Sequence, residues 1–306
     1  MRLAASLPIG ALVAACGGDS NTPPASPTFD PRYADHDLIP REGTPAPTAT
    51  PEPPFIIPAG EQKLALMPGT PYETPLWIYG SGLPGKIVMS LGGVHGNEPG
   101  GWMAAEQLQA KFRPARGAFL VVPRANKIPI RYFERTLPEL GDLNRLYPGD
   151  PNGQPMAQMA AQVVDTLRTY RVDCVIDMHE SWAFYKDRPQ NGTAYLGQTV
   201  STAPSEPAIT FVRDIVAAVN SRIQAPREEL FDRPFPGPSE GPDARPGGPA
   251  PPGSPQGSSS LALPRWLPNI TAILVEMGQQ QPLDRRVALH VDIFNEMARR
   301  LNVIDA

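Results

Sequence analysis

The amino-acid sequence predicts an α/β fold in which a central mixed, largely parallel sheet is flanked by helices within a single domain. Two patterns predict it. Short runs of apolar and β-branched residues, typical of buried strands, occur at 86–91, 118–122, 174–176 and 270–275. Apolar residues recur at helical spacing over 99–108, 156–170, 207–223 and 283–301. Because the strands and helices alternate along the chain, we expect the helices to cover a mostly parallel sheet.

The charge and composition of the chain limit its function and its domain organisation. The 306 residues include 27 basic and 31 acidic side chains, which give a formal net charge of -4. This balance provides no basic surface for phosphates, so nucleic acid is not an expected partner. With 41% hydrophobic residues the chain can bury one sizeable core, but its 40 prolines are too many for one compact domain. They are concentrated in two tracts.

The N-terminus has the pattern of a bacterial signal peptide. An apolar run at 3–15 follows Arg2 and is too short to span a bilayer as a stable helix. The letters LVAAC at 12–16 resemble the lipobox of bacterial lipoproteins, which implies removal of 1–15 and lipidation of Cys16. An ordinary signal peptide with an incidental cysteine is the alternative. With lipidation, we expect an extracytoplasmic protein held at the membrane only through its lipid anchor.

Two proline-rich tracts are predicted to lie outside the regular core. Residues 16–56 form a disordered Pro- and Thr-rich tether, and 57–306 form the folded domain. Within this domain, 226–260 is rich in Pro and Gly and is predicted to be a disordered insertion, with a lid as the alternative. Apart from Cys16, the chain has only Cys174, which lies in an apolar strand and is expected to be a buried, inert thiol.

The placement of the few histidines points to a metal site. His95 and Glu98 stand three residues apart in a glycine-rich turn between a predicted strand and a helix, and His179 ends another buried strand. Functional side chains gather at such strand ends in α/β sheets. Two imidazoles and one carboxylate make a zinc site whose fourth position is free for water. The spacing alone also permits either histidine to be a hydrogen-bonded structural residue.

Two further segments carry polar residues that a simple core does not require. Asn144 and Arg145 lie in a turn-rich loop at 141–149, where an amide and a guanidinium can grip a carboxylate. Glu276 follows the strongly apolar strand at 270–275, and a general base beside a metal-bound water accounts for a carboxylate there. The alternatives are a surface salt bridge for Arg145 and a helix-capping carboxylate for Glu276.

Four segments together resemble a known family. The letters GVHGNE at 93–98, DLNR at 142–145, DMH at 177–179 and VEMG at 275–278 occur in the order found in the zinc carboxypeptidase superfamily. They look most like its succinylglutamate desuccinylase and aspartoacylase branch, and the match runs from Ile87 to the C-terminus. Four ordered motifs are far more specific than any one of them, and they favour a metallohydrolase.

The resemblance assigns a catalytic centre to four of the matching residues. It implies one Zn²⁺ ion held by His95, Glu98 and His179. It makes Glu276 the general base that takes the proton of the zinc-bound water.

The same resemblance assigns residues that bind substrate or support the site. Asn144 and Arg145 would hold the substrate's carboxylate, and Asp142 would orient a metal-binding histidine. The family also uses an upstream arginine to stabilise the oxyanion. Arg131 fits best because related sequences show an arginine followed by an aromatic residue there, and Arg135 is the alternative.

The resemblance implies hydrolysis of an amide bond next to a free carboxylate, in a small peptide or an N-acyl amino acid. Enzymes of the branch carry a further β-rich domain after the catalytic glutamate, whereas 277–306 holds enough residues for one helix, so we expect a more open cleft. A tyrosine often assists in the superfamily; Tyr185 and Tyr195 are both candidates, and neither is assigned to the site. The alternative function is a non-catalytic surface lipoprotein that binds carboxylate-bearing ligands, against which the retained general base argues.

Three other polar residues receive a weaker interpretation. His290 lies on the apolar stripe of the last predicted helix, where packing is the expected role. Glu180, beside the last metal ligand, is expected either to line the cleft or to bond locally. His36 lies in the tether and has no expected role.

Overall fold

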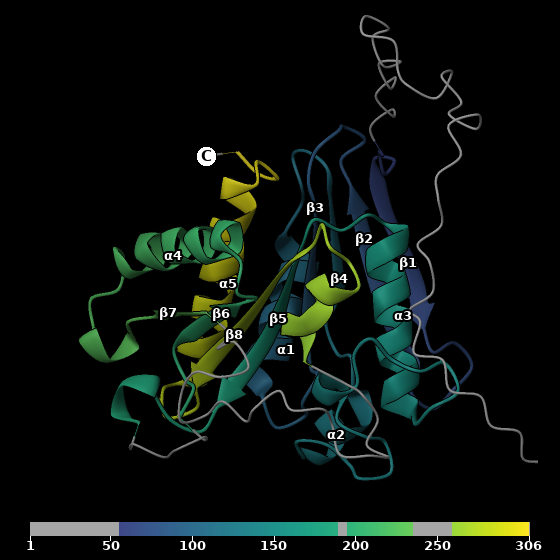
Figure 1. Cartoon of the computed structure of the whole chain (residues 1–306), viewed down its shortest axis with the longest axis horizontal. Coiled ribbons are helices and arrows are strands. Elements are labelled where there is room, and N and C mark those ends of the chain that lie inside the picture. The colour runs from purple at the N-terminus through teal and green to yellow at the C-terminus, as the bar shows by residue number, and fades with distance from the viewer. Residues whose placement is uncertain (1–54, 189–194, 235–258, 306) are drawn as a thin grey trace, which may run out of the picture. The chain divides into compact units, whose positions relative to one another are not determined.

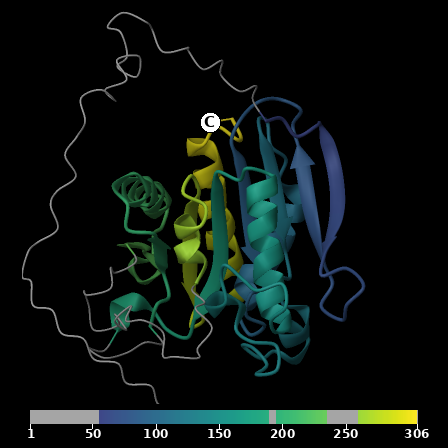
Figure 2. The ribbon, with the colours of Figure 1, turned by 45° about the vertical axis from the view of Figure 1, so that its right-hand side comes forward.

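The described part of the chain is built around an eight-stranded mixed sheet (Figure 1). The computed structural model describes residues 55–188, 195–234 and 259–305. The strands are β1 Gly60–Leu66, β2 Thr74–Gly80, β3 Ile87–Gly92, β4 Ala118–Val122, β5 Cys174–Ser181, β6 Thr199–Thr202, β7 Phe231–Pro234 and β8 Thr271–Gly278. Across the sheet their order is β1-β2-β4-β3-β5-β8-β6-β7, and Figure 2 shows β1 and β2 (purple to blue) at one edge and the green strands at the other.

The centre of the sheet is parallel and its flanks are mixed. Strand β3 pairs in parallel with β4 and β5, and β5 pairs in parallel with β8. Antiparallel pairs join β1 to β2, β2 to β4 and β6 to β8. The carboxyl ends of β3, β5 and β8 therefore meet at the same edge, which is where α/β sheets place their functional groups.

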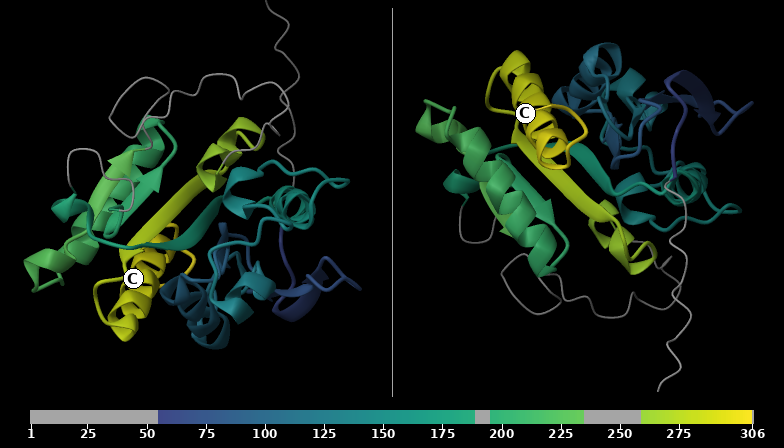
Figure 3. Two further views of the ribbon diagram at one scale, coloured as in Figure 1. Left: turned by 90° about the horizontal axis from the view of Figure 1, so that it is seen from below. Right: turned by 90° about the horizontal axis from the view of Figure 1, so that it is seen from above.

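Helices cover both faces of this sheet, as the two views of Figure 3 show. The helices are α1 Pro99–Lys111, α2 Lys127–Tyr132, α3 Pro155–Thr169, α4 Glu206–Asn220 and α5 Leu283–Arg300. Successive side chains of a strand point to opposite faces: Met89 packs with the α3 residue Met159 in one core, and Val88 packs with the α5 residue Phe294 in the other. No helix within the described residues is long and apolar enough to cross a membrane.

The four strands and four helices expected from apolar patterning are all present, with ends shifted by a few residues. Four strands, β1, β2, β6 and β7, were not expected. The first six residues of β1 are exposed, so the strand has no apolar face to reveal it. Strands β6 and β7 are four residues long, and their sequences TVST and FDRP carry no clear alternation.

The predicted disordered insertion at 226–260 is wrong at both of its ends. Residues 226–228 form a 3₁₀ helix (η5, Pro226–Glu228), and β7 joins the sheet beside β6. A second 3₁₀ helix, η6 (Ser260–Arg265), begins at the last residue of the predicted tract. Strand β7 was not predicted because a four-residue strand that ends in proline resembles the proline-rich tract around it. The rest of this tract, 235–258, and the predicted signal peptide, lipidation site Cys16 and tether up to 54 lie outside the described residues.

Candidate metal centre

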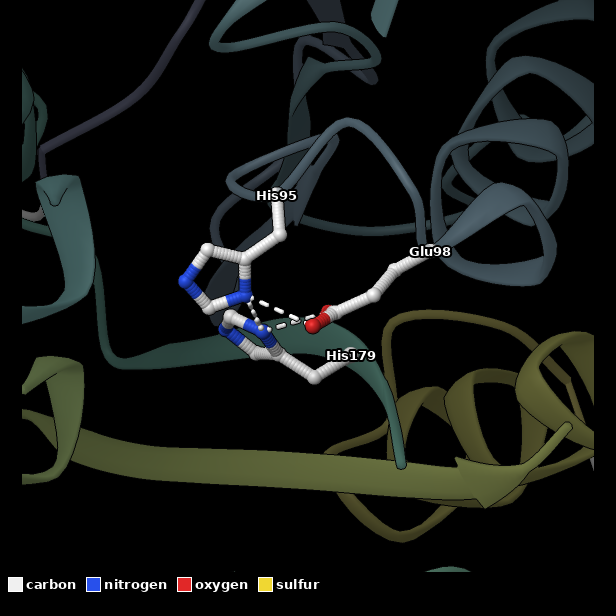
Figure 4. A group of neighbouring side chains, drawn as sticks. All are labelled: His95, Glu98 and His179. Atoms are coloured by element: carbon white, nitrogen blue, oxygen red, sulfur yellow. Dashed lines mark hydrogen bonds and ion pairs between the residues drawn. The ribbon is translucent and has the colours of Figure 1, made fainter. Parts of the chain in front are cut away.

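Three predicted metal ligands meet at the carboxyl edge of the sheet (Figure 4). His95 lies in the turn after β3, Glu98 immediately precedes α1, and His179 lies near the end of β5. One ligand atom from each of the three lies within 4.8 Å of the others. All three side chains are buried, with no more than 4% of each exposed.

The turn that carries two of these ligands depends on glycine. Gly93 has a φ of +69°, a left-handed conformation that side chains other than glycine rarely adopt. A Cβ on Gly96 would collide with the backbone of Pro129, so the turn also packs too closely against α2 for a larger residue. Backbone bonds from Ala125 to Gly92 and from Asn126 to Gly93, both 2.9 Å, hold the turn to the loop after β4. The direction of the His95 side chain follows from this fixed backbone.

The atoms that face one another in this cluster are the inner nitrogens of the rings and the carboxylate. His95 Nδ1 lies 2.8 Å from Glu98 Oε1, and His179 Nδ1 lies 2.9 Å from Glu98 Oε2. The two Nδ1 atoms are 3.0 Å apart. Three donor atoms of the types that zinc prefers therefore converge on one point.

The outer nitrogen of each ring faces a second carboxylate. His95 Nε2 lies 3.0 Å from Asp142 Oδ1, and His179 Nε2 lies 2.9 Å from Asp177 Oδ2. Carboxylates in this position commonly fix the tautomer of a metal-binding histidine, with the proton on the outer nitrogen. When both rings are neutral, as metal ligands must be, their Nδ1 atoms present lone pairs to each other and to the Glu98 carboxylate. A cation shared by the three groups removes this repulsion, so the donor set fits a metal ion.

The electrostatics of the cluster follow from burying charges of both signs together. Burial lowers the pKa of His179, but the Asp177 and Glu98 carboxylates outweigh it and hold that pKa well above its usual value. Burial raises the pKa of Glu98, but His95 and His179 outweigh it and hold that pKa well below its usual value. The Glu98 side chain is therefore ionised, as a metal ligand must be.

The predicted general base, Glu276, lies beside the cluster on the neighbouring strand. It stands opposite His179 in the parallel register between β5 and β8. Side chains at registered positions of adjacent strands point to the same face of a sheet. Burial and the nearby Glu98 carboxylate raise the pKa of Glu276 to about 7. The helix-capping alternative does not describe a residue inside the strand β8.

The structure brings Arg135, and not Arg131, to the metal cluster. Arg135 Nη1 donates to Glu98 Oε1 over 2.9 Å, and Nη2 lies 3.7 Å from Asp142 Oδ2. Its backbone carbonyl accepts a hydrogen bond from Gly96 N in the ligand-bearing turn. Arg131 instead lines a surface depression between α1, α2 and α5. The preference for Arg131 rested on its aromatic neighbour, and the position of Arg135 beside Glu98 favours the alternative.

The predicted carboxylate-binding pair lies in the 3₁₀ helix η3 (Leu143–Arg145), close to the cluster. Asp142 caps this helix by accepting a hydrogen bond from Asn144 N over 3.0 Å. Asn144 is buried, and its Oδ1 accepts a hydrogen bond from Ser260 N over 3.0 Å. Arg145 is exposed, and its Nη1 donates to the carbonyl of Asn144 over 2.7 Å. Among the described residues Arg145 forms no ion pair. Burial raises the pKa of Asp142, but His95, Arg135 and Arg145 outweigh it and lower that pKa to about 2.

Glu180 bonds locally and does not line the cleft. It alternates with His179 along β5, so it points to the opposite face, where Arg286 Nη1 of α5 donates to its Oε2 over 2.6 Å. Burial raises the pKa of Glu180 to about 7. A Cβ on Gly100 would collide with this carboxylate, which indicates how closely Glu180 approaches the start of α1.

The remaining predicted residues lie apart from the ligand atoms of the cluster. Cys174 is buried, as expected, and burial raises the pKa of its thiol. His290 is fully buried within α5, in agreement with a packing role. Tyr185 packs its ring against Phe231 of β7, and Tyr195 is half-buried.

Sequence reasoning missed Asp177, although a signal for it was present. Asp177 and His179 are two residues apart in a buried strand, and side chains at that spacing share one face. A carboxylate with no exposed surface needs hydrogen-bond donors, and a histidine on the same face is one. Asp177 Oδ2 lies 2.9 Å from the outer nitrogen of His179, and Asp142 Oδ1 lies 3.0 Å from the outer nitrogen of His95.

The residues of the metal cluster lie in a region of the chain that matches a known protein family. Residues 84–186 match the family model of the succinylglutamate desuccinylase/aspartoacylase catalytic domain. The N-alpha-acetyl-L-2,4-diaminobutyric acid deacetylase of Halomonas elongata is 33% identical over 98 residues. That match covers 31% of this chain and 28% of the deacetylase.

Solved structures confirm the predicted α/β fold class. Product-bound cell shape determinant Csd4 from Helicobacter pylori has a TM-score of 0.60 at 17% identity, and the match covers 80% of this chain and 56% of Csd4. Succinylglutamate desuccinylase/aspartoacylase from Rhodobacter sphaeroides has a TM-score of 0.57 at 19% identity, covering 84% of this chain and 70% of that one. The tripeptide-bound Csd4 structure has a TM-score of 0.58, and this chain spans about half of its length, 52%.

Proposed function

We propose that this protein is a zinc-dependent hydrolase of amide bonds next to a free carboxylate, and that it belongs to the succinylglutamate desuccinylase/aspartoacylase family. The convergence of His95, Glu98 and His179, with a carboxylate behind each histidine, carries the proposal. The family match over 84–186 supports the class of reaction. A deacetylase of an N-acetyl amino acid and a D,L-carboxypeptidase are among the similar proteins, which supports acyl amino acids and small peptides as substrates.

The side chains around the cluster divide the chemistry among them. Bound zinc would polarise the scissile carbonyl and lower the pKa of a water towards ~7. Glu276, on the same face as His179, takes the proton of the attacking water and gives it to the leaving nitrogen. Arg135, beside Glu98, stabilises the negative charge that develops on the carbonyl oxygen.

The residues of η3 orient the substrate. The exposed guanidinium of Arg145 and the amide of Asn144 hold the free carboxylate through charge-assisted and neutral hydrogen bonds. Because Asp142 both caps η3 and bonds to His95, the carboxylate-binding pair is fixed relative to the metal ligands. Because the spacing between η3 and the metal ligands is fixed, the site selects substrates whose carboxylate lies close to the scissile amide.

The test compares the wild type with Glu276→Gln on a panel of dipeptides, tripeptides and N-acyl amino acids. Both proteins are stripped with a chelator and reloaded with zinc, and zinc content is measured beside turnover. We expect equal zinc content and a loss of about 10²–10⁴ in kcat/KM for Glu276→Gln. Glu206→Gln, an exposed carboxylate in the first turn of α4, is the control and should keep wild-type turnover.

Zinc-loaded wild type without Glu276-dependent turnover on this panel would contradict the proposed function. Binding of carboxylate-bearing ligands that is unchanged by zinc removal would then favour a surface binding protein. The two outcomes separate because the first is measured by product formation and the second by calorimetry on the same preparations.

We also propose that the protein is anchored outside the cytoplasm by lipid on Cys16, as the lipobox-like LVAAC at 12–16 suggests. In a bacterial host, wild type should partition with membranes and carry a diacylglyceryl mass on an N-terminal peptide beginning at Cys16. Cys16→Ala should lose both properties. A wild-type peptide that is cleaved elsewhere and unlipidated would contradict the proposal.

A further inference from the structure

A chain of hydrogen bonds and ion pairs links the two metal-binding histidines behind the cluster. It starts at the His95 ring and passes through the Asp142 carboxylate to η3. From η3 it continues to η6, and then through the Asp177 carboxylate to the His179 ring. Its members, in order, are His95, Asp142, Asn144, Ser260, Asp177 and His179. The two histidines face each other at 3.0 Å, so the arrangement is a closed ring.

Ser260 is the member of this ring that joins its two halves. Its Oγ donates to Asp177 Oδ2 over 2.6 Å, and its backbone N–H donates to Asn144 Oδ1 over 3.0 Å. Ser260 is 1% exposed, Asp177 is fully buried and Asn144 is 5% exposed. Hydrogen bonds made away from water at these distances fix orientation strongly, because the alternative is a buried polar group without a partner.

The Asp177 carboxylate depends on the hydroxyl of Ser260. Asp177 Oδ2 accepts a hydrogen bond from the Ser260 hydroxyl and lies 2.9 Å from His179 Nε2, whereas Oδ1 has no hydrogen-bond partner among the described residues. A buried carboxylate that loses its hydroxyl donor reorients or draws in water. Since this carboxylate directs the His179 ring, loss of the hydroxyl changes the ring that presents Nδ1 to the metal.

The Asn144 amide depends on the backbone of the same residue. The bond from Ser260 N uses the amide oxygen, and it therefore turns the NH₂ group of Asn144 away from Ser260. An NH₂ group is the donor that a substrate carboxylate needs. One residue of η6 thus sets the rotamer of a substrate-binding amide and supports a metal ligand on β5.

We propose that Ser260 is a positioning residue that couples the substrate-binding pair in η3 to the metal ligand His179. This inference rests on the proposed function, because it assigns Ser260 an effect on a metal and a substrate carboxylate. It extends that function by assigning an effect on zinc binding and substrate binding to η6, a segment that carries neither a metal ligand nor the general base. Ser260 touches neither substrate nor metal in this scheme.

The experiment compares Ser260→Ala with Ser260→Thr and with Ser259→Ala. Threonine keeps the hydroxyl, and Ser259 is the half-buried neighbour whose side chain makes no hydrogen bond to Asp177 or Asn144 in the described part of the chain. Zinc affinity is measured by competition with a chelator, and the Co²⁺ absorption spectrum reports the ligand geometry. Michaelis constants are then measured at saturating zinc.

We expect Ser260→Ala to weaken zinc binding about tenfold, at the lower end of the range for groups that support a metal ligand. The Co²⁺ spectrum should shift. KM should rise more than kcat falls, because residue 260 is no longer tied to Asp177 and its backbone N–H then holds the Asn144 amide less firmly. Ser260→Thr should restore zinc affinity to within about threefold of wild type. Ser259→Ala should match wild type in all three measurements.

A purely structural role predicts a different result. Ser260→Ala would then lower the free energy of unfolding of the metal-free protein and leave zinc affinity, the Co²⁺ spectrum and KM unchanged, which overturns the inference. If Ser260→Ala does not fold, Ser260→Cys, with a weaker donor of similar size, should bind zinc more weakly than wild type and Ser260→Thr; an affinity equal to wild type overturns the inference. Wild type that binds no zinc contradicts the proposed function itself.

Discussion

At the scale of single residues, the alternation of side chains along β5 decides which groups serve the metal centre. Asp177 and His179 share one face and lie 2.9 Å apart, whereas Glu180 points to the other face and pairs with Arg286. The sequence shows this alternation once the strand is recognised. This alternation distinguishes Asp177, which supports a metal ligand, from Glu180, which has a structural role.

Removal of the Asp177 charge should weaken the metal site without removing a ligand. In Asp177→Asn the supporting group at His179 Nε2 becomes a neutral amide, so the ring loses its fixed tautomer. We expect zinc affinity to fall about 10–100-fold, measured by chelator competition. Asp173→Asn, which pairs with the exposed Lys86 outside the site, is the control and should leave zinc affinity unchanged.

The two candidate arginines should separate clearly in kinetics. Arg135 reaches Glu98, whereas Arg131 lines a surface depression away from the ligand atoms. We expect Arg135→Ala to lower kcat about 10²–10³-fold, as for loss of an oxyanion donor, and Arg131→Ala to stay within about threefold of wild type. The reverse order, measured at saturating substrate and zinc, would restore the original preference for Arg131.

The residues that sequence could identify are those carried by ordered motifs. The three ligands and Glu276 were named from GVHGNE, DMH and VEMG, and the structure brings them to one edge of the sheet. Arg135 and Ser260 were beyond reach because their roles arise from contacts between loops. Two arginines four residues apart are equivalent until the chain after α2 is folded, and Ser260 lies 116 residues from Asn144.

At the scale of elements, strands with a buried apolar run were predictable and edge strands were not. Strand β4, buried throughout, has the predicted bounds, whereas β1 presents Gly, Glu, Gln and Lys to solvent and carries no periodic signal. Strand β7 was hidden in a proline-rich tract. Such edge elements form through hydrogen bonding to a neighbour that the sequence does not identify.

The packing of α1 against β5 links the fold to the metal ligand Glu98. A Cβ on Gly101 would collide with the backbone carbonyl of Met178, which cannot rotate away. We expect Gly101→Ala to lower the free energy of unfolding by about 1–3 kcal/mol and to weaken zinc binding, because α1 must shift with Glu98 at its start. The free energy of unfolding is measured by urea unfolding, and zinc affinity is measured by chelator competition.

Gly69→Ala provides the matched comparison for this prediction. Gly69 has a φ of +72° with open space around its missing side chain, so the substitution adds backbone strain without a collision. We expect it to cost roughly 1 kcal/mol and to leave zinc affinity unchanged. Equal zinc affinities for Gly101→Ala and Gly69→Ala would show that α1 packing does not set the position of Glu98.

At the scale of the whole molecule, a buried neutral histidine makes the fold sensitive to acid. His290 is fully buried, and burial together with the positive charge of His179 lowers its pKa to about 3. The unfolded chain protonates this ring near its ordinary pKa of about 6.5. The unfolded state therefore binds more protons than the folded state between these values, and stability is lost as the pH falls from about 6.5 towards 3.

This contribution can be isolated by replacing the ring. In chelator-treated protein, the free energy of unfolding of wild type relative to His290→Phe should be independent of pH above 7. Below pH 6.5 it should fall by up to about 1.4 kcal/mol per pH unit. A difference between the two proteins that stays constant from pH 8 to pH 5 would show that His290 takes up its proton as readily in the folded protein as in the unfolded chain.

The central claim is that one zinc ion at His95, Glu98 and His179 is required for amide hydrolysis, and a stoichiometric titration tests it most directly. Chelator-treated wild type is titrated with zinc while turnover of the best substrate in the panel is followed. We expect no turnover without zinc, a linear rise, and a break at one equivalent, with Glu98→Gln showing no rise in this range. Turnover that is independent of zinc, or one equivalent of bound zinc without any turnover, would contradict the account.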